Sequence, residues 1–216
     1  MQTLYKLTSD NGTTHNNTKW EVGTTHSLPK VNNPELCSRD VLHAYKSINL
    51  GLLLNPIHAG FKSPLLFKCE GEVVAEDWSK VGCSLLTITE QLPLPEWYVN
   101  ANSRYKVQVY FAILCAESVL HKFEEEHPDD SRPRKALETT RAYLEGKATK
   151  KEVITRAISN AAANAAANAA ADAAYYAAAN AAYYAAYAAY ATACAAKVDN
   201  NINFIKLADE AVRLGV

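Results

Sequence analysis

Hydrophobic and polar residues alternate, or β-branched residues gather, in four short segments in the first half of the chain. A period of two is typical of strands that bury one face, and the Gly, Pro and Asp residues between the segments favour turns. The pattern predicts strands at residues 3–8, 19–22, 65–74 and 81–89, antiparallel where the loops are short. Between them, residues 38–45 and 47–54 are predicted as short helices, the first capped by Ser38. We therefore expect a small antiparallel-sheet module with short helices at residues 1–95.

The second half has the pattern of helices, with apolar residues three and four positions apart and few turn residues. Helices are predicted at residues 103–126, 132–145 and 202–214, and another begins after Thr149. Thr149 and Glu152 fit a capping box, in which each side chain satisfies a free backbone N–H of the other residue. An all-α module is therefore expected at residues 96–216, and the fold class of the whole chain is α+β.

A low-complexity tract dominates this second module. Residues 157–196 contain 25 alanines in 40 positions and neither glycine nor proline. Because alanine has the highest helix propensity, the tract predicts one long helix from residue 150 to residue 197. Such a helix is about 70 Å long, against about 44 Å for the width of a compact chain of this length, so it must protrude, bend or pack along a partner. A break near Asp172 or Asn180, giving a helical hairpin, is the alternative.

The larger side chains of the tract recur at alternating steps of four and three residues. The positions 176, 180, 183, 187, 190 and 194 therefore share a strip about 80° wide on the predicted helix. We name Tyr176, Tyr183, Tyr187 and Tyr190 the tyrosine row. One interpretation packs these rings against the 103–126 helix. The other exposes them to a protein partner or a second copy of the chain, since tyrosine gives a large contact area at low entropic cost. Stacking on a nucleotide is a third interpretation, less attractive for a chain of neutral charge.

Composition and charge narrow the class of partner. The chain has 22 Lys and Arg against 23 Asp and Glu, a net charge of -1, so we expect it to bind neither nucleic acid nor a membrane. It has no apolar run long enough to span a bilayer, and the apolar centre of a signal peptide is missing, so a cytoplasmic protein is expected. The five cysteines include no C-x-x-C pair and are expected to be reduced.

Candidate chemistry lies in the N-terminal module. His43, Tyr45, Asn55 and His58 place imidazole, phenol and amide groups within a short stretch, and they are candidates to line a pocket for a nucleotide-like ligand. The segment Leu-His-Ala-Tyr that ends at Tyr45 resembles the histidine segment of NAD-using ADP-ribosyltransferases. That likeness implies a nucleotide pocket, with or without turnover. The simpler interpretation of His43 is a core histidine bonded to backbone.

The sequence gives less support to a metal site or to a nucleophilic cysteine. Cys37, His43, His58 and Cys69 are 6, 15 and 11 residues apart, unlike the short paired spacings of structural zinc ligands. A histidine could activate Cys37 or Cys69, yet no nucleophile motif surrounds either thiol, and buried inert thiols are expected. The chain has no P-loop, no dinucleotide-binding glycine motif and no G-x-S-x-G. We expect no metal, no cofactor and no catalytic residue, and we favour binding over catalysis.

A sequence motif in the helical module is similar to one in a known family. The motif Pro-Asp-Asp-Ser-Arg-Pro-Arg-Lys-Ala-Leu-Glu at residues 128–138 is followed by Arg-Ala-Tyr-Leu-Glu-Gly at 141–146, a capped helix and the alanine tract. This arrangement resembles the helical domain of Imm-5-like immunity proteins, and similar alanine-rich modules occur in bacteriophage proteins. The likeness spans about residues 105–196. It implies an all-α fold and a role in neutralising a toxin or a rival defence.

Elementary chemistry gives the charged residues of that motif a structural role. We expect Asp130, Arg132 and Arg134 to provide a helix cap and salt bridges at a tight interhelical corner. For the whole chain we favour a non-catalytic binding protein that sequesters a partner in conflict between bacteria, phages and toxins, as immunity or counter-defence. The alternative is a protein that binds a nucleotide or nucleotide-derived signal in the N-terminal module, or carries out ADP-ribosyl-type chemistry there.

Overall fold

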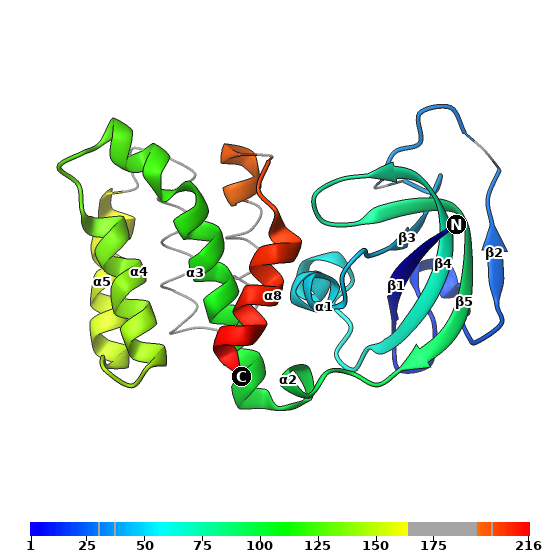
Figure 1. Cartoon of the computed structure of the whole chain (residues 1–216), viewed down its shortest axis with the longest axis horizontal. Helices are drawn as coiled ribbons and strands as arrows, with labels where there is room; N and C mark the ends of the chain where they lie inside the picture. The colour runs from blue at the N-terminus through cyan, green and yellow to red at the C-terminus, as the bar shows by residue number, and fades with distance from the viewer. Residues whose placement is uncertain (30, 37, 164–193, 200) are drawn as a thin grey trace. The chain divides into compact units, whose positions relative to one another are not determined.

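A computed structural model describes residues 1–29, 31–36, 38–163, 194–199 and 201–216. The chain divides into two compact units, Met1–Glu96 and Trp97–Val216. The first contains an antiparallel sheet with short helices and the second contains helices, so the predicted α+β class is confirmed (Figure 1). Among the described residues, no helix combines the length and the apolar character needed to cross a membrane.

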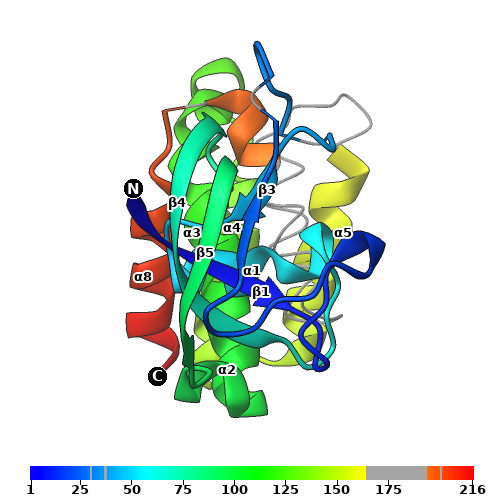
Figure 2. The same ribbon diagram turned by 90° about the vertical axis from the view of Figure 1, so that its right-hand side faces the viewer.

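The N-terminal unit is built on five antiparallel strands (Figure 1, Figure 2). They are β1 Gln2–Thr8, β2 Thr25–Ser27, β3 Leu42–Ala44, β4 Leu65–Glu76 and β5 Val81–Leu92. The sheet runs in the order β1-β4-β5-β2, and β3 also pairs with β5. The backbone groups of Tyr5 and Tyr45 exchange two hydrogen bonds of 2.8 Å, which join the residue after β3 to β1. The strands β1, β4, β5 and β3 thus form a closed ring.

The inside of this ring is the core of the N-terminal unit. Its buried members are Leu4, Trp20, Ala44, Phe67, Cys69, Val81, Cys83, Leu86 and Ile88. Leu4 and Lys6 occupy alternate positions of β1, and both are buried. Because side chains two residues apart on a strand share a face, β1 directs a lysine to the same side as its core leucine.

The strand predicted at residues 19–22 is wrong. The chain turns here instead, with the Thr24 N–H donating to the Glu21 carbonyl at 2.9 Å and Gly23 at a φ of 89°. The apolar residue that suggested a strand, Trp20, is indeed 1% exposed, but it enters the core from a loop. A short 3-10 helix, His15–Asn17, precedes it. An alternating pattern over only four residues thus indicated that one side chain is buried, but it did not indicate that the backbone pairs in a sheet.

The helix predicted at residues 38–45 is also wrong. Its second half is β3, which pairs with β5, and its first half is a series of bends. The Ser38 hydroxyl donates to the Glu35 carbonyl at 2.8 Å and accepts from the Asp40 N–H at 3.0 Å, so it closes a turn. Serine favours turns as well as helix caps, and here the long-range pairing with β5 decides the outcome.

The helix predicted at residues 47–54 is confirmed as α1, Ile48–His58. Ser47 is its N-cap and accepts the Leu50 N–H at 3.2 Å. The helix runs past the predicted end because Pro56 lies in its last turn, where its missing donor costs a single bond. The carbonyl of Asn55 then accepts both the Ala59 and Gly60 N–H groups and ends the helix.

The C-terminal unit is a row of packed helices (Figure 1). The described helices are α2 Glu96–Val99 at the unit boundary, then α3 Ala101–Glu126, α4 Arg132–Leu144, α5 Lys150–Ala163 and α8 Phe204–Gly215. The helix α3 packs against both α8 and α4, and α4 packs against α5. The helices predicted at 103–126, 132–145 and 202–214 are therefore confirmed.

Side-chain caps start three of these helices. Asn100 accepts the N–H groups of Asn102 and Ser103 at the start of α3, and Asn203 accepts the Lys206 N–H at the start of α8. The predicted capping box starts α5: the Thr149 N–H donates to Glu152 Oε2 at 2.7 Å, and the Glu152 N–H donates to Thr149 Oγ1 at 3.3 Å. The local sequence was sufficient to predict the cap of α5, because a capping box needs only two residues three positions apart. The caps at Asn100 and Asn203 were not predicted.

The long helix predicted for residues 150–197 is described only at its two ends. Its start is α5, and residues 194–198 are helical as well. The break considered near Asp172 or Asn180, and all four members of the tyrosine row, lie outside the described residues. Both remain predictions.

Candidate functional site

Two of the four pocket residues predicted in the N-terminal unit form a direct pair. The Tyr45 hydroxyl lies 3.1 Å from Nδ1 of His58, and the two rings stack at 5.8 Å with an angle of 11° between their planes. Burial raises the pKa of the Tyr45 phenol, and burial followed by the charge of Lys80 lowers the pKa of His58 to about 4. At neutral pH both groups are therefore uncharged, and the pair can offer hydrogen bonds but no charge to a ligand.

His43 lies on β3 and is bonded through both its ring and its backbone. Its Nε2 meets the Leu36 carbonyl, and its own carbonyl accepts a 2.7 Å hydrogen bond from Nζ of Lys6. Burial lowers the pKa of the His43 imidazole. The ring bond to backbone agrees with the simpler interpretation, in which His43 is a core histidine.

Asn55 uses its amide to close the loop after α1. Its Nδ2 donates to the Phe61 carbonyl at 2.8 Å, and its Oδ1 accepts the Phe61 N–H at 3.2 Å. These two bonds hold the turn that follows the helix, and the residue is 3% exposed. The structure thus pairs Tyr45 with His58 and turns Asn55 towards the loop. Whether these residues bind a nucleotide stays a prediction.

Lys6 is a buried lysine of this unit that was not among the residues predicted from the sequence. Its Nζ lies 4.2 Å from the centre of the Trp20 ring, and its side chain is almost fully buried. Desolvation lowers the pKa of its ammonium group to about 8. A signal was present in the sequence, because Lys6 keeps the strand phase of Leu4 and so had to face the core.

The cysteines of the closed ring are buried thiols. Burial raises the pKa of Cys69 to about 12 and that of Cys83 to about 11, so both stay protonated at neutral pH. None of the four described cysteines forms a disulfide, and Cys37 lies outside the described residues. Within the part of the chain that the structure describes, no three His, Cys, Asp or Glu side chains are placed to hold a metal ion.

In the C-terminal unit, the charged residues of the sequence motif brace a helical hairpin. Arg134 on α4 makes a bidentate contact with Glu124 on α3, with two hydrogen bonds of 2.6 Å. Two turns further along, Arg141 donates to both carboxylate oxygens of Glu117 at 2.9 Å. Each step of seven residues along α3 is matched by seven residues in reverse along α4, the pattern of antiparallel helices. We name these two contacts the ion-pair ladder.

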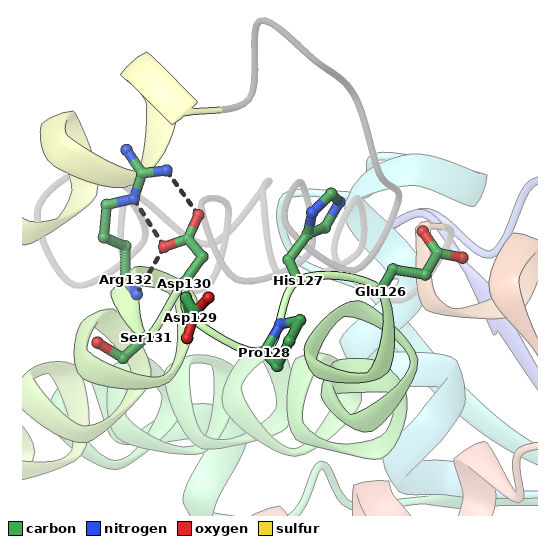
Figure 3. Close-up of a pocket in the computed structure, with 7 residues that line it drawn as sticks. All are labelled: Glu126, His127, Pro128, Asp129, Asp130, Ser131 and Arg132. Carbon is green, nitrogen blue, oxygen red and sulfur yellow. Dashed lines mark hydrogen bonds and ion pairs between the residues drawn. The ribbon is translucent and has the colours of Figure 1, made fainter.

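The corner between α3 and α4 is organised by a single carboxylate (Figure 3). Asp130 accepts the backbone N–H of Arg132 at 3.1 Å and binds its guanidinium through hydrogen bonds of 2.7 and 2.6 Å. The contact with Arg132 holds the pKa of Asp130 below its usual value. The expected salt bridges of Asp130, Arg132 and Arg134 are therefore confirmed. The expected cap is wrong, because the N-cap of α4 is Ser131, which makes no side-chain cap hydrogen bond, and Asp130 accepts the Arg132 N–H from one residue before Ser131.

A hollow of about 570 Å³ opens at this corner (Figure 3). Its lining is the stretch from Glu126 to Arg132, which joins the end of α3 to the start of α4. The ring of His127, one of the lining residues, lies 4.8 Å from that of Phe123, a buried residue of α3. Carboxylates outnumber cations along the lining. The corner can accept hydrogen bonds from donors on a partner surface.

The ion-pair ladder leads to a testable expectation. Glu124→Arg places two guanidinium groups together and should lower the free energy of unfolding by about 1 kcal/mol, while adding Arg134→Glu should restore most of it. Urea unfolding of both variants measures the coupling. Glu125→Arg makes the same charge change one residue away and serves as the control. A double variant no more stable than Glu124→Arg alone would show that the two residues do not interact.

Comparison with known proteins gives a family match for the C-terminal unit. Residues 100–210 match the family described as Imm-5 like putative immunity protein, which is about half of the chain and lies entirely within the helical unit. The N-terminal half has no family match. Neither the curated proteins nor the solved structures gave a match. The matched segment contains both the ion-pair ladder and the corner motif from which the likeness was first inferred, and the chain belongs to the Imm-5 like immunity protein family.

Proposed function

We propose that this protein protects by binding, and that its helical unit captures a protein partner and neutralises it without catalysis. Membership of the family indicates an immunity-type role. The observation that carries the proposal is the coincidence of the family match, residues 100–210, with one compact unit, Trp97–Val216. Because the match lies within this unit, we assign the role shared by the family to the helical unit.

The chemistry of the motif residues supports binding over catalysis. Arg134 and Arg141 each engage a carboxylate on α3, and Arg132 engages Asp130. Guanidinium groups held in bidentate pairs fix the geometry of a hairpin. The hairpin therefore acts as a support, and we assign the partner contacts to a different part of the helical unit.

The tyrosine row is the contact surface we propose. Its members were selected by spacing alone, and tyrosine is among the residues that contribute most to protein interfaces. The same row could join two copies of this chain, so a homo-oligomer through the alanine- and tyrosine-rich tract belongs to the same proposal. Sequestration of a partner would follow from the area of contact without a chemical step.

Growth protection against a toxin encoded beside the gene tests this proposal. Cells expressing the toxin should survive with the wild-type chain, and Tyr183→Ala with Tyr187→Ala should reduce survival at least tenfold by weakening capture. The matched control is Tyr175→Ala with Tyr184→Ala, which removes two rings that lie off the row on the predicted helix. Equal loss in both double variants would remove the row as the contact surface. A gene in a phage genome with no toxin beside it would favour counter-defence.

The second candidate function is binding of a nucleotide or nucleotide-derived signal by the N-terminal unit. It draws on the stacked pair of Tyr45 and His58, two of the four predicted residues, whose side chains meet in the structure. Under this candidate, nucleotides should raise the thermal midpoint of the wild-type chain, and His43→Ala should abolish the rise. An unchanged midpoint with every nucleotide tested, together with normal growth protection by His43→Ala, would count against it.

A further inference from the structure

The Lys6 amine lies inside the closed ring of the N-terminal unit, in contact with groups from several separate segments. Its Nζ donates to the His43 carbonyl on β3 at 2.7 Å and lies 4.2 Å from the centre of the Trp20 ring, which comes from the loop before β2. The thiols of Cys69 on β4 and Cys83 on β5 also act on it electrostatically. Lys6 is 5% exposed and Trp20 is 1% exposed.

These surroundings suit an ammonium group poorly. An ammonium has three N–H donors, and the ring supplies one carbonyl oxygen, one aromatic face and two thiols that are weak acceptors. A charge removed from water without a carboxylate partner is costly, so burial favours loss of the proton. The two forms of Lys6 differ mainly in their attraction to Trp20, because only the ammonium places a charge over the indole face. The Trp20 ring is also held by a hydrogen bond from its Nε1–H to Thr14 Oγ1 at 2.9 Å and by an edge contact with the His26 ring.

We propose that Lys6 is a proton-operated switch in the folded N-terminal unit: its charged form is attracted to the face of Trp20, and loss of the proton removes that attraction, so that the indole shifts while its contacts with Thr14 and His26 remain. The switch would act on the candidate ligand residues, because the carbonyl that Lys6 holds belongs to His43, and Tyr45 follows on the same segment. This inference concerns the N-terminal unit and is independent of partner capture by the helical unit.

Three titratable groups face Lys6 itself, and a fourth contacts Trp20. The first three are Cys69, Cys83 and His43, one from each of β4, β5 and β3. The fourth is His26 of β2, whose ring meets the Trp20 ring edge-on with 4.5 Å between their centres, so the Lys6→Met variant is needed to separate its effect on Trp20. Burial holds the pKa of Cys69 at about 12 and that of Cys83 at about 11, and it lowers the pKa of His43, so all three are neutral above pH 7. Desolvation places the pKa of Lys6 at about 8.

The test is a pH titration of the full chain by nuclear magnetic resonance, with carbon-13 in the lysine side chains. One Cε signal should move with a midpoint near pH 8 and should be missing in Lys6→Met. The indole N–H signal of Trp20 should move with the same midpoint in the wild type, and should not move between pH 7 and pH 10 in Lys6→Met or in Lys6→Arg, which keeps its charge throughout.

Two outcomes would overturn the proposal. If the Cε signal that Lys6→Met removes moves only above pH 10 in the wild type, the amine does not exchange its proton in the proposed range. If it moves near pH 8 while the Trp20 indole signal stays still, the charge on Lys6 does not hold Trp20. The wild-type titration gives both answers even where a variant folds poorly.

Discussion

Lys6→Met should remove a pH dependence of stability worth about 2 to 3 kcal/mol between pH 7 and pH 10. The pKa of Lys6 is about 8 in the folded chain, against a reference value of 10.5. Because the folded pKa is the lower one, the unfolded chain binds more protons between these two values, and stability rises with pH across that window. Below about pH 8 the full cost of the buried charge is present, and it fades as the pH approaches 10.5.

The thiols of Cys69 and Cys83 change the pH dependence of stability in the opposite direction. The effect of Lys6 must therefore be measured as the difference between the wild type and Lys6→Met. Cys69 and Cys83 have pKa values of about 12 and 11 when folded, above their reference value of 9.0. The unfolded chain therefore loses thiol protons first above pH 9, which lowers stability there. Both forms of the protein share this effect, and it cancels in the difference between them.

Urea unfolding of the wild type and Lys6→Met at pH 7 and pH 10 measures the effect. The wild type should gain 2 to 3 kcal/mol relative to the variant on going to pH 10. At pH 7 the variant should be at least as stable, since replacing a buried charge by an apolar side chain of similar volume is often neutral or stabilising. A difference between the two proteins that is the same at both pH values would show that Lys6 does not titrate on folding in this range.

Gly51→Ala should destabilise the N-terminal unit by about 1 to 3 kcal/mol, although alanine is the better helix former. In an open helix position this change stabilises by about 1 kcal/mol. Here a Cβ atom on Gly51 would lie 2.9 Å from Cγ and 3.0 Å from Cδ2 of Tyr45. The Tyr45 backbone is fixed by its two hydrogen bonds to Tyr5, so the ring can yield only by leaving its contact with His58.

A double-mutant cycle separates the clash from the helix propensity. In a Tyr45→Ala background the obstruction is gone, and Gly51→Ala should become stabilising by up to about 1 kcal/mol. Thermal or urea unfolding of the four proteins gives the coupling. If Gly51→Ala destabilised both backgrounds equally, the close approach of the Tyr45 ring would not be the cause.

Structural features that depend on residues close together in the sequence could be predicted, and those that depend on distant segments could not. Thr149 and Glu152 cap α5 as predicted, and residues 65–74 and 81–89 belong to β4 and β5, because caps and long apolar strands are encoded within a few residues. Residues 38–45 have local features of a helix, but pairing with β5 makes part of them a strand. No local signal in that segment reports where β5 will lie.

The charged residues show the same division. The ion-pair ladder could have been found, since Glu117 and Glu124 are seven residues apart on α3 and so are Arg134 and Arg141 on α4. The environment of Lys6 could be inferred only in part. Strand phase sets its direction, whereas the carbonyl and the aromatic ring that it contacts come from segments brought in by the closed sheet.

Hydrogen–deuterium exchange of the full chain, with and without the toxin encoded beside its gene, tests the central claim most directly. Binding should slow exchange in peptides from residues 97–216, with the largest change in the tract that contains the tyrosine row. Exchange in residues 1–96 should change little. Protection confined to residues 1–96 would contradict the claim that the helical unit captures the partner.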